Sequence, residues 1–489
     1  MRQVLWFCVV LATAAYICGP IVDPDLWWHI TVGRWILAFH EIPVVDHWNM
    51  FGAGQPWRAY SWPLEIVFAA AEQLGDMHGL YAVKLALAVA VACSLAWVCS
   101  RLAGDWFVGL LLGIFATLGC FNHFTLRPQS LVWIYLALVL LLADEVEQRG
   151  WTVRRGGLLA LVMMAWANTH ITTALGIGVA VAWVAAAGWR TAGLTLGSMV
   201  LGTLVTPYLG GEWLTFFSKT GHPLMLRSIS EFQPATIMQH STAFLVIAAA
   251  LVGTGLFTRP RVLDLFKILA GGGMLLGALA VVKFLPFAVI VLSALIAVMW
   301  RRGGKAGFGN LGEGIHRLRT VAGAIPAEGA SFLLLCTVIV NVWRVWQAPL
   351  NTVEIPVSAV DFIEERQLPH PVLNDFGRGG YMMYRFSDER GVLEHKVPID
   401  GRTNVMPKEV WEKAHRAFSG REEWREYIEL VKPRTILWKR ASPLTAILLN
   451  DDAYCLVFRS GTSEDGFAVF VERPWFLAHG AGLQSDNCR

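Results

Sequence analysis

Long runs of apolar residues alternate with short polar connections over most of the chain, up to residue 346. A helix that crosses a membrane needs about 20 mainly apolar residues. One shorter run, 157–167, ends at Asn168-Thr169-His170, which predicts a polar hairpin tip. The pattern predicts about eleven spanning helices. They are expected at residues 4–22, 80–100, 106–121, 129–143, 157–167, 171–187, 191–206, 242–257, 262–282, 286–300 and 330–346.

The pattern changes after residue 346, where charged residues become frequent. Short β-rich runs alternate there with two helix-like stretches, 407–418 and 422–431, which predicts a small α/β domain over 347–489. The expected strands are 372–376, 396–400, 435–438, 454–458 and 467–471. Residues 478–489, which contain Gly, Ser and Asn, are expected to form a frayed tail.

The composition fits a membrane protein, since 55% of the residues are hydrophobic and only 16% are charged. A soluble domain has about 25% charged residues. Lys and Arg number 40 against 37 Asp and Glu, so the charge is too balanced and too sparse for a nucleic-acid binder. Most cysteines lie in apolar runs and no zinc-ligand spacing occurs; Cys455 and Cys488 are the two that could form a disulfide.

The distribution of positive charge sets the expected orientation. With Met1 in the cytoplasm, Arg and Lys concentrate in the cytoplasmic loops, as the positive-inside rule requires. The first apolar run could be a signal peptide, but it lacks a small-x-small cleavage site, so we interpret it as a span. The predicted organisation is a transmembrane domain, 1–346, with outer loops 23–79 and 207–241, followed by an extracytoplasmic domain, 347–489.

Two carboxylates, Asp23 and Asp25, directly follow the first span. In one interpretation Asp23 caps a surface helix that runs to residue 39, with Pro24 at its first position. In the other, the carboxylates have a function, because charges at a membrane boundary are costly unless solvated, paired or used. Asp25 and His29 share a helix face and could bind a divalent cation or supply a general base. More acidic and imidazole groups follow in the same loop: His40, Glu41, Asp46, His47 and Glu65.

This loop resembles the first outer loop of bacterial multi-spanning glycosyltransferases of the GT-C fold. The resemblance rests on Asp23-Pro-Asp-Leu-Trp-Trp-His29, on Gly33-Arg34-Trp-Ile36 and on Trp57-Arg-Ala-Tyr-Ser-Trp-Pro-Leu-Glu65. Shorter matches follow at Arg127-Pro128, 166–170, 206–208 and 283–287. These enzymes resemble protein O-mannosyltransferases and the catalytic subunit of oligosaccharyltransferase, and they take sugars from polyprenyl-phosphate carriers.

The resemblance implies that Asp25, with Asp23 beside it, lies near the acceptor as base or as ligand of a divalent cation such as Mg²⁺ or Mn²⁺. A second carboxylate is implied on a later outer loop, and Glu65, Glu212 and Glu231 remain open as candidates. His29 and Arg34, within the same motif, are further substrate-binding candidates.

Three cations are expected on the outer side at the depth of a lipid headgroup: Arg127, Arg227 and Lys283. They could bind the phosphate of a lipid donor, or each could be an anchor that snorkels to the membrane surface. Lys283 fits the anchor interpretation least, because it lies in an almost unbroken apolar stretch. His170, at the hairpin tip, is expected to be a hydrogen-bonded turn histidine, with substrate binding as the alternative.

Two Gly-containing segments, 372–381 and 398–403, are similar in layout to the start of the outer domain of oligosaccharyltransferases. The tandem tryptophans of that family are missing, so recognition of a peptide acceptor does not carry over. The alternative is that these segments are turns at strand ends.

The leading hypothesis is an inverting glycosyltransferase of the bacterial plasma membrane. It would move a sugar from a polyprenyl-phosphate donor to a glycan, lipid or protein acceptor on the outer face, with membrane lipid as its surroundings. The alternatives are a transporter or lipid flippase with an extracytoplasmic domain, and a non-catalytic assembly subunit.

Overall fold

The structure is a computed structural model. It describes residues 2–220, 230–241, 243–245, 247, 265–402, 404–421, 423–462, 465–485 and 487–488. The chain forms two compact units. Unit 1 comprises Met1–Pro20, Leu80–Phe217 and Ile229–Pro349, and unit 2 comprises Ile21–Gly79, Ser218–Ser228 and Leu350–Arg489.

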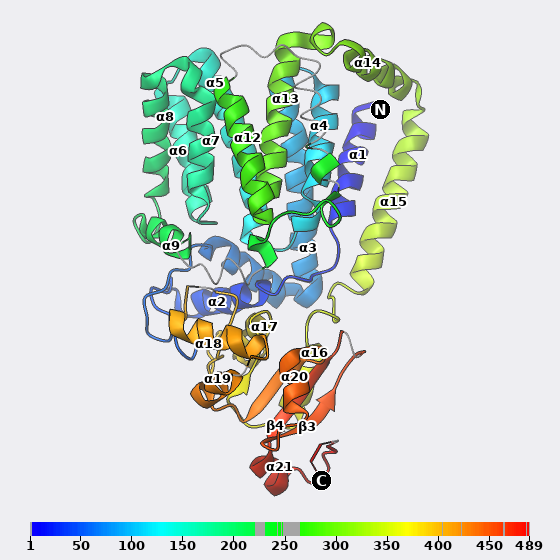
Figure 1. The fold of residues 1–489 in the computed structure, drawn as a ribbon. Coiled ribbons are helices and arrows are strands. Elements are labelled where there is room, and N and C mark those ends of the chain that lie inside the picture. Colours follow the sequence, from blue (N-terminus) through cyan, green and yellow to red (C-terminus); the bar gives the residue numbers. More distant parts are fainter. Residues whose placement is uncertain are drawn as a thin grey trace. The chain divides into compact units, whose positions relative to one another are not determined.

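Unit 1 is a bundle of helices (Figure 1). Its helices are α1 (Arg2–Ile17), the later part of α3 (Trp62–Ala103), α4 (Trp106–Gly119), α5 (Pro128–Arg149), α6 (Val153–Ala167), α7 (Thr173–Val184), α8 (Trp189–Thr203), the first part of α9 (Gly211–Thr220), α12 (Leu265–Ala280), α13 (Leu285–Gly307), α14 (Gly309–Ala324) and α15 (Ala327–Gln347). The described residues of the unit also contain the 3-10 turns η1 (Phe121–His123), η2 (Ala185–Ala187), η3 (Ser230–Phe232) and η5 (Val282–Phe284). α6 packs on α8, α1 on α15, and α13 on both α12 and α4.

Close packing of α3 on α4 depends on two glycines one helical turn apart. A Cβ atom at Gly109 would lie 2.1 Å from the Cα of Ser100, and one at Gly113 would lie 2.3 Å from the Cα of Ala96. Small residues at this spacing let two helix backbones approach, as is common between helices in membranes. Asp105 begins α4 by accepting hydrogen bonds from the amides of Phe107 and Val108, at 3.0 and 3.3 Å.

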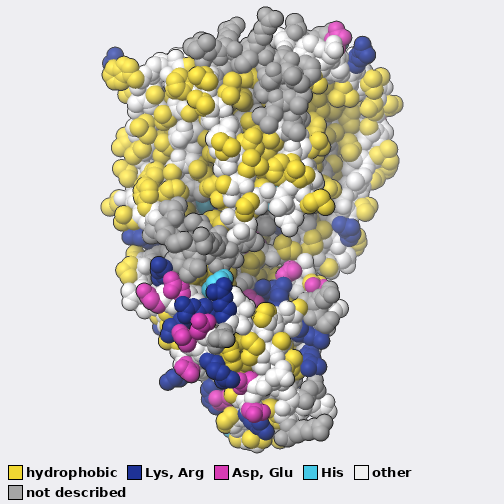
Figure 2. Space-filling model, in the orientation of Figure 1, with side chains coloured by type: hydrophobic (Ala, Val, Ile, Leu, Met, Phe, Trp, Pro, Cys, Tyr) yellow, Lys and Arg dark blue, Asp and Glu magenta, His cyan; other side chains and the backbone are white. Residues whose placement is uncertain are grey.

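Four helices in the described part of the chain are long and apolar enough to cross a membrane: Trp62–Ala103, Pro128–Arg149, Val282–Gly303 and Ala327–Gln347. Shorter apolar helices occupy Gln3–Ile17, Trp106–Gly119, Thr173–Ala187 and Leu265–Ala280. Figure 2 shows hydrophobic side chains gathered over the helices of unit 1, which suits a lipid environment. A helix overlaps each predicted span that the described residues cover, whereas the span at 242–257 lies largely outside them. The number of membrane crossings stays a prediction.

Unit 2 contains a four-stranded sheet with the order β1-β2-β4-β3. The strands are β1 (Val372–Leu373), β2 (Thr435–Lys439), β3 (Tyr454–Arg459) and β4 (Phe467–Glu472), and β1 is parallel to β2 while the other pairs are antiparallel. The helices of the unit are α2 (Leu26–Phe39), the first part of α3, α16 (Val357–Glu365), α17 (Gly379–Phe386), α18 (Lys408–Phe418), α19 (Trp424–Val431), α20 (Pro443–Leu448) and α21 (Arg473–His479). Trp411 and Tyr427, from α18 and α19, pack with Ile436, Trp438 and Phe470 of the sheet to form its core.

Three features of unit 2 differ from the sequence-based expectations. Residues 21–79 belong with the C-terminal residues, whereas the predicted division grouped that loop with the spans. The strand expected at 396–400 is absent from the described sheet, and Val397 instead bridges Asn49. The tail is tied down rather than frayed, because Cys488 forms a disulfide with Cys455 and Asn487 donates to the carbonyl of Tyr454. The disulfide confirms the predicted cysteine pair.

Candidate active site

Asp25 lies at the residue that precedes α2, and its carboxylate makes no capping hydrogen bond to the helix. Asp23 is buried, and its Oδ1 accepts a hydrogen bond of 2.8 Å from the amide of Asp25. The expected capping arrangement is therefore shifted, because Asp23 closes the turn before the helix and α2 begins only at Leu26. This turn fixes the backbone of Asp25 without using the Asp25 carboxylate.

The half-buried carboxylate of Asp25 lies against the backbone of Gly401. A Cβ atom at this glycine would lie 1.9 Å from Oδ1 of Asp25 and 3.5 Å from Nε1 of Trp28. Only a residue without a side chain leaves that space open. The second Gly-containing segment of the sequence analysis thus meets the first outer loop within unit 2.

A buried ion cluster holds that segment in place. The Nε and Nη2 atoms of Arg402 donate to the two oxygens of Asp400, at 2.8 and 2.9 Å, and Nη1 donates to Oδ1 of Asp46 at 2.6 Å. All three side chains are at most 1% exposed. Asn49 also donates to Asp400, at 3.1 Å. Breaking one partner of a buried pair costs about 3–5 kcal/mol, so the cluster firmly joins the outer loop to residues 400–402.

Glu65 and His29 form a second buried pair. Nδ1 of His29 lies 3.0 Å from Oε1 of Glu65, while Oε2 has no hydrogen-bond partner among the residues described. Glu65 lies in the part of α3 before a break at Gly75 and Asp76, and that part belongs to unit 2. Burial raises the pKa of Glu65 well above its usual value, with the charge of Arg402 opposing the shift. This carboxyl group therefore keeps its proton to higher pH than an exposed glutamate.

Arg34 forms an ion pair within unit 2. Its Nη2 and Nε atoms donate to the two oxygens of Glu72, at 2.7 and 3.2 Å, and Tyr384 donates to the same carboxylate at 3.0 Å. The guanidinium carbon also lies 4.6 Å from the centre of the Tyr384 ring. These contacts orient Arg34 between α2, α3 and α17.

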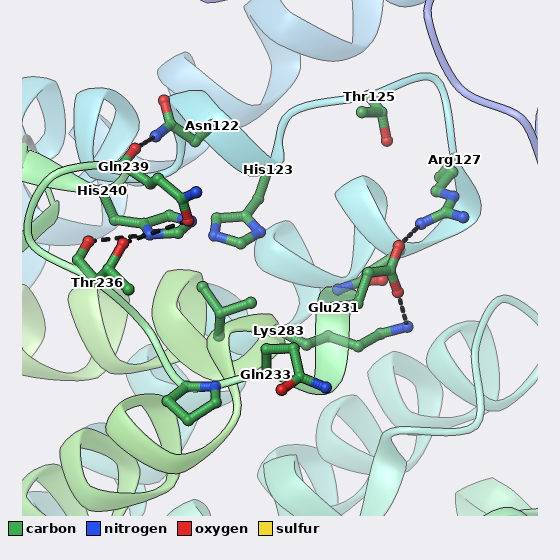
Figure 3. A pocket seen from close by; sticks show the side chains of 13 residues that line it. Asn122, His123, Thr125, Arg127, Glu231, Gln233, Thr236, Gln239, His240 and Lys283 are labelled. Atoms are coloured by element: carbon green, nitrogen blue, oxygen red, sulfur yellow. Dashed lines mark hydrogen bonds and ion pairs between the residues drawn. The ribbon is translucent and has the colours of Figure 1, made fainter. Parts of the chain in front are cut away.

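Unit 1 contains a pocket of about 660 Å³ that brings together two of the three predicted cations (Figure 3). Arg127 precedes Pro128, the first residue of α5, and Lys283 lies in η5. Both donate to Glu231 of η3, Arg127 to Oε1 and Lys283 to Oε2, the latter at 2.8 Å. The amide of Val282 donates to the carbonyl of Gln233 at 2.9 Å, which holds η3 and η5 together.

The electrostatics of this triad are those of an anion site. Burial would raise the pKa of Glu231, but the charges of Arg127 and Lys283 outweigh burial and hold it far below the usual range. Glu231 is therefore ionised at any ordinary pH. One carboxylate faces two cations, so the triad keeps a net positive charge.

The pocket also contains polar groups for which the sequence offers no pattern. His123 and His240 stack with ring centres 5.5 Å apart, and Asn122 donates to the carbonyl of Gln239. Burial, reinforced by the nearby His240, lowers the pKa of His123 to about 4. Single histidines separated by more than 100 residues carry no spacing signal, so only the tertiary structure could reveal this pair.

Several candidate residues from the sequence lie outside the surroundings of Asp25 in unit 2 and outside the pocket of unit 1. Nδ1 of His170 lies 2.9 Å from Oγ1 of Thr172, the geometry of a turn histidine. Both carboxylate oxygens of Glu212 are buried and lack hydrogen-bond partners in the described part of the chain. Arg227 lies outside the described residues. Across those same residues no group of three or more His, Cys, Asp or Glu could hold a metal ion.

No protein-family model matches the chain, and no curated protein matches it by sequence. Solved structures match it by fold. The oligosaccharyltransferase of Archaeoglobus fulgidus in the apo form aligns with a TM-score of 0.52 at 10% identity, covering 89% of this chain and 70% of that one. ArnT from Cupriavidus metallidurans, bound to undecaprenyl phosphate, aligns with a TM-score of 0.51 at 13% identity, covering 95% and 96%. A variant of the arabinofuranosyltransferase AftD from Mycobacteria aligns with a TM-score of 0.51 at 13% identity. The alignment covers 96% of this chain and 41% of that one.

These structures are glycosyltransferases of the GT-C fold. The chain has this fold, which confirms the relation indicated by the motifs of the first outer loop. At such low identity the likeness establishes the fold and leaves donor, acceptor and site residues as proposals.

Proposed function

We propose that the protein is a membrane glycosyltransferase that moves a sugar from a polyprenyl-phosphate donor to an acceptor on the outer face of the bacterial plasma membrane. The observation that carries the proposal is the pocket in which Arg127 and Lys283 share the carboxylate of Glu231. The GT-C fold supports the reaction class. A phosphate group is a stronger partner for two cations than a single carboxylate, and it would take the place of Glu231.

Asp25 is the proposed base. Its neighbour Asp23 fixes the turn before α2, and Gly401 leaves room for the carboxylate, so the position of the Asp25 side chain is set within unit 2. The acceptor hydroxyl oxygen would bond to the anomeric carbon while the bond from that carbon to the phosphate oxygen breaks. The electron pair leaves with the phosphate, the hydroxyl proton passes to Asp25, and the configuration is inverted.

The cations of the pocket would stabilise the departing phosphate, on which negative charge develops. A divalent cation, Mg²⁺ or Mn²⁺, is a further proposal: Asp23 and Asp25 supply the oxygen ligands that such ions prefer. Such an ion, when bound, would act as a Lewis acid. The steps assigned to Asp25, Arg127 and Lys283 do not depend on it.

The proposed orientation places the N-terminus in the cytoplasm and residues 347–489 outside. The disulfide between Cys455 and Cys488 supports it, because disulfides persist in oxidising compartments and are rare in the cytosol.

The test is an assay of the purified protein in lipid nanodiscs with a panel of polyprenyl-phosphate sugars and candidate glycan, lipid and protein acceptors. We expect transfer with at least one donor, with inversion at the anomeric carbon, and loss of transfer in Asp25→Asn. Movement of the intact donor across a vesicle membrane without sugar transfer would instead favour a flippase.

A further inference from the structure

The pocket of unit 1 has two chemically different ends (Figure 3). Arg127, Glu231 and Lys283 form the charged end. The other end carries amide, hydroxyl and imidazole groups from Asn122, His123, Thr236, Gln239 and His240, and none of these described residues is a carboxylate, lysine or arginine. A volume of about 660 Å³ falls within the range of about 300–1,000 Å³ typical of small-molecule sites.

His123 offers an unused hydrogen-bonding atom at the uncharged end. Its Nε2 is buried and lacks a hydrogen-bond partner among the residues described. The low pKa of His123 keeps the ring neutral at physiological pH, so the imidazole can accept or donate one hydrogen bond without carrying charge. A buried polar atom without a partner is unfavourable, and a bound hydroxyl group would satisfy it.

The neighbouring groups are oriented by local contacts. Nδ1 of His240 lies 3.1 Å from the backbone carbonyl oxygen of Thr236, so Nδ1 is the donor in this hydrogen bond, since a carbonyl oxygen can only accept. Oγ1 of Thr236 donates to Oε1 of Gln239 at 3.2 Å. The rings of His123 and His240 stack, with an angle of 17° between their planes, so the two imidazoles together form a polar wall at this end of the pocket.

We infer that the uncharged end binds the sugar of the donor, and that this sugar is neutral and carries hydroxyl groups. The inference rests on the proposed function, which assigns the donor phosphate to the charged end. Hydroxyl groups both donate and accept, as do amides and imidazoles, so they match this wall. Among the described side chains of the uncharged end, an amino sugar would find no carboxylate and a uronic acid no cation, because Arg127, Glu231 and Lys283 lie at the charged end.

The experiment compares two ligands that differ only in the sugar: a polyprenyl phosphate, and the same lipid carrying a neutral hexose. Binding to the full-length protein in nanodiscs is measured for the wild type, His123→Phe, His123→Gln and Lys283→Met. Phe keeps the ring but removes the polar atoms, whereas Gln restores a donor and an acceptor. We expect His123→Phe to weaken binding of the hexose donor about five- to tenfold, the loss of one neutral hydrogen bond, and to leave bare polyprenyl phosphate unchanged.

His123→Gln should recover part of that loss, and Lys283→Met should weaken both ligands alike. A His123→Phe variant that binds both ligands normally, or loses both equally, would overturn the sugar site while leaving the phosphate site intact. Normal binding of both ligands by Lys283→Met would instead refute the phosphate assignment, and the sugar assignment with it.

Donor charge gives an independent check. Replacing the hexose by the corresponding aminohexose or hexuronic acid should weaken binding to the wild type about tenfold or more, because the charge would enter the end of the pocket where the described side chains offer no counter-ion. Equal or tighter binding of either charged donor would contradict the proposed neutral sugar.

Discussion

The carboxylate of Asp25 occupies the space that a side chain at Gly401 would need: a Cβ atom there would lie 1.9 Å from Oδ1. The two residues come from opposite ends of the chain and meet within unit 2. Gly401 is flanked by Asp400 and Arg402, whose buried ion cluster prevents the backbone from moving away. The position of the proposed base is therefore set by a glycine that is far from it in sequence.

Gly401→Ala should accordingly push the Asp25 carboxylate aside. We expect transfer to fall on the order of 100-fold, the effect of misplacing a reacting group by about 1 Å. The matched control is Gly377→Ala, because a Cβ there would meet its nearest neighbour, Oδ1 of Asp375, at an ordinary 3.6 Å. Equal activities of the two variants would show that the contact does not position Asp25.

Asp25→Asn should abolish transfer and leave the protein folded. The amide keeps the shape of the side chain but loses its basicity, and a general base contributes about 10²- to 10⁴-fold. Asp23→Asn should cost much less, because its side-chain oxygen can still accept the hydrogen bond from the amide of Asp25. Turnover and thermal stability of both purified variants provide the check; near-normal turnover of Asp25→Asn would exclude it as the base.

Lys283→Met should weaken donor binding and slow transfer together, since it removes a charge-assisted bond worth about 1.5–3 kcal/mol, or roughly 10- to 100-fold in affinity. Lys283→Arg should retain part of both properties because the charge survives. The control is Arg344→Met, which removes an exposed cation in the last turn of α15.

Glu231→Gln should change phosphate affinity in the opposite direction. Removing the carboxylate leaves Arg127 and Lys283 without their shared anion, so bare polyprenyl phosphate should bind several-fold more tightly. Isothermal titration of the wild type, Lys283→Met and Glu231→Gln with polyprenyl phosphate measures the expected loss of affinity in the first variant and the expected gain in the second. If Glu231→Gln binds polyprenyl phosphate more weakly than the wild type, Glu231 does not compete with phosphate.

The buried Glu65 should make the protein less stable as pH rises. Its pKa is raised in the folded state, so the folded protein holds this proton more tightly than the unfolded chain does. The resulting stabilisation is complete below the ordinary glutamate pKa and is lost as pH rises toward the raised value. Glu65→Gln cannot ionise and should flatten this part of the pH dependence of Tm. Parallel Tm curves for the two proteins would contradict the raised pKa.

The proposed topology predicts that reporter fusions after Arg155 and Arg302 report the cytoplasm and that fusions after Gln347 report the outside. Cys455 and Cys488 should resist alkylation in intact cells until a reductant is added, because they are joined as a disulfide. Reporter activity in the cytoplasm after Gln347, or alkylation without reductant, would reverse the proposed orientation.

The sequence by itself determined the features that depend on local pattern. The length of apolar runs predicted the apolar helices of unit 1 but not α9 or α14, because a helix that crosses lipid must satisfy its own backbone whatever it packs against. The alternation of strands and helices predicted β2, β3, β4, α18 and α19, and the two cysteines outside the apolar runs predicted the disulfide. The motif around Asp25 indicated the fold that the solved structures confirm.

Only the tertiary structure decided which distant residues meet. Arg127 and Glu231 are 104 residues apart, Lys283 and Glu231 are 52 apart, and Arg402 and Asp46 are 356 apart. No periodicity links such pairs, since each depends on how several helices and loops pack at once. The expected strand at 396–400 failed for the same reason, because its backbone pairs with the outer loop instead of the sheet. The sequence pattern predicted the helices and strands, whereas packing decided which charged residues form ion pairs.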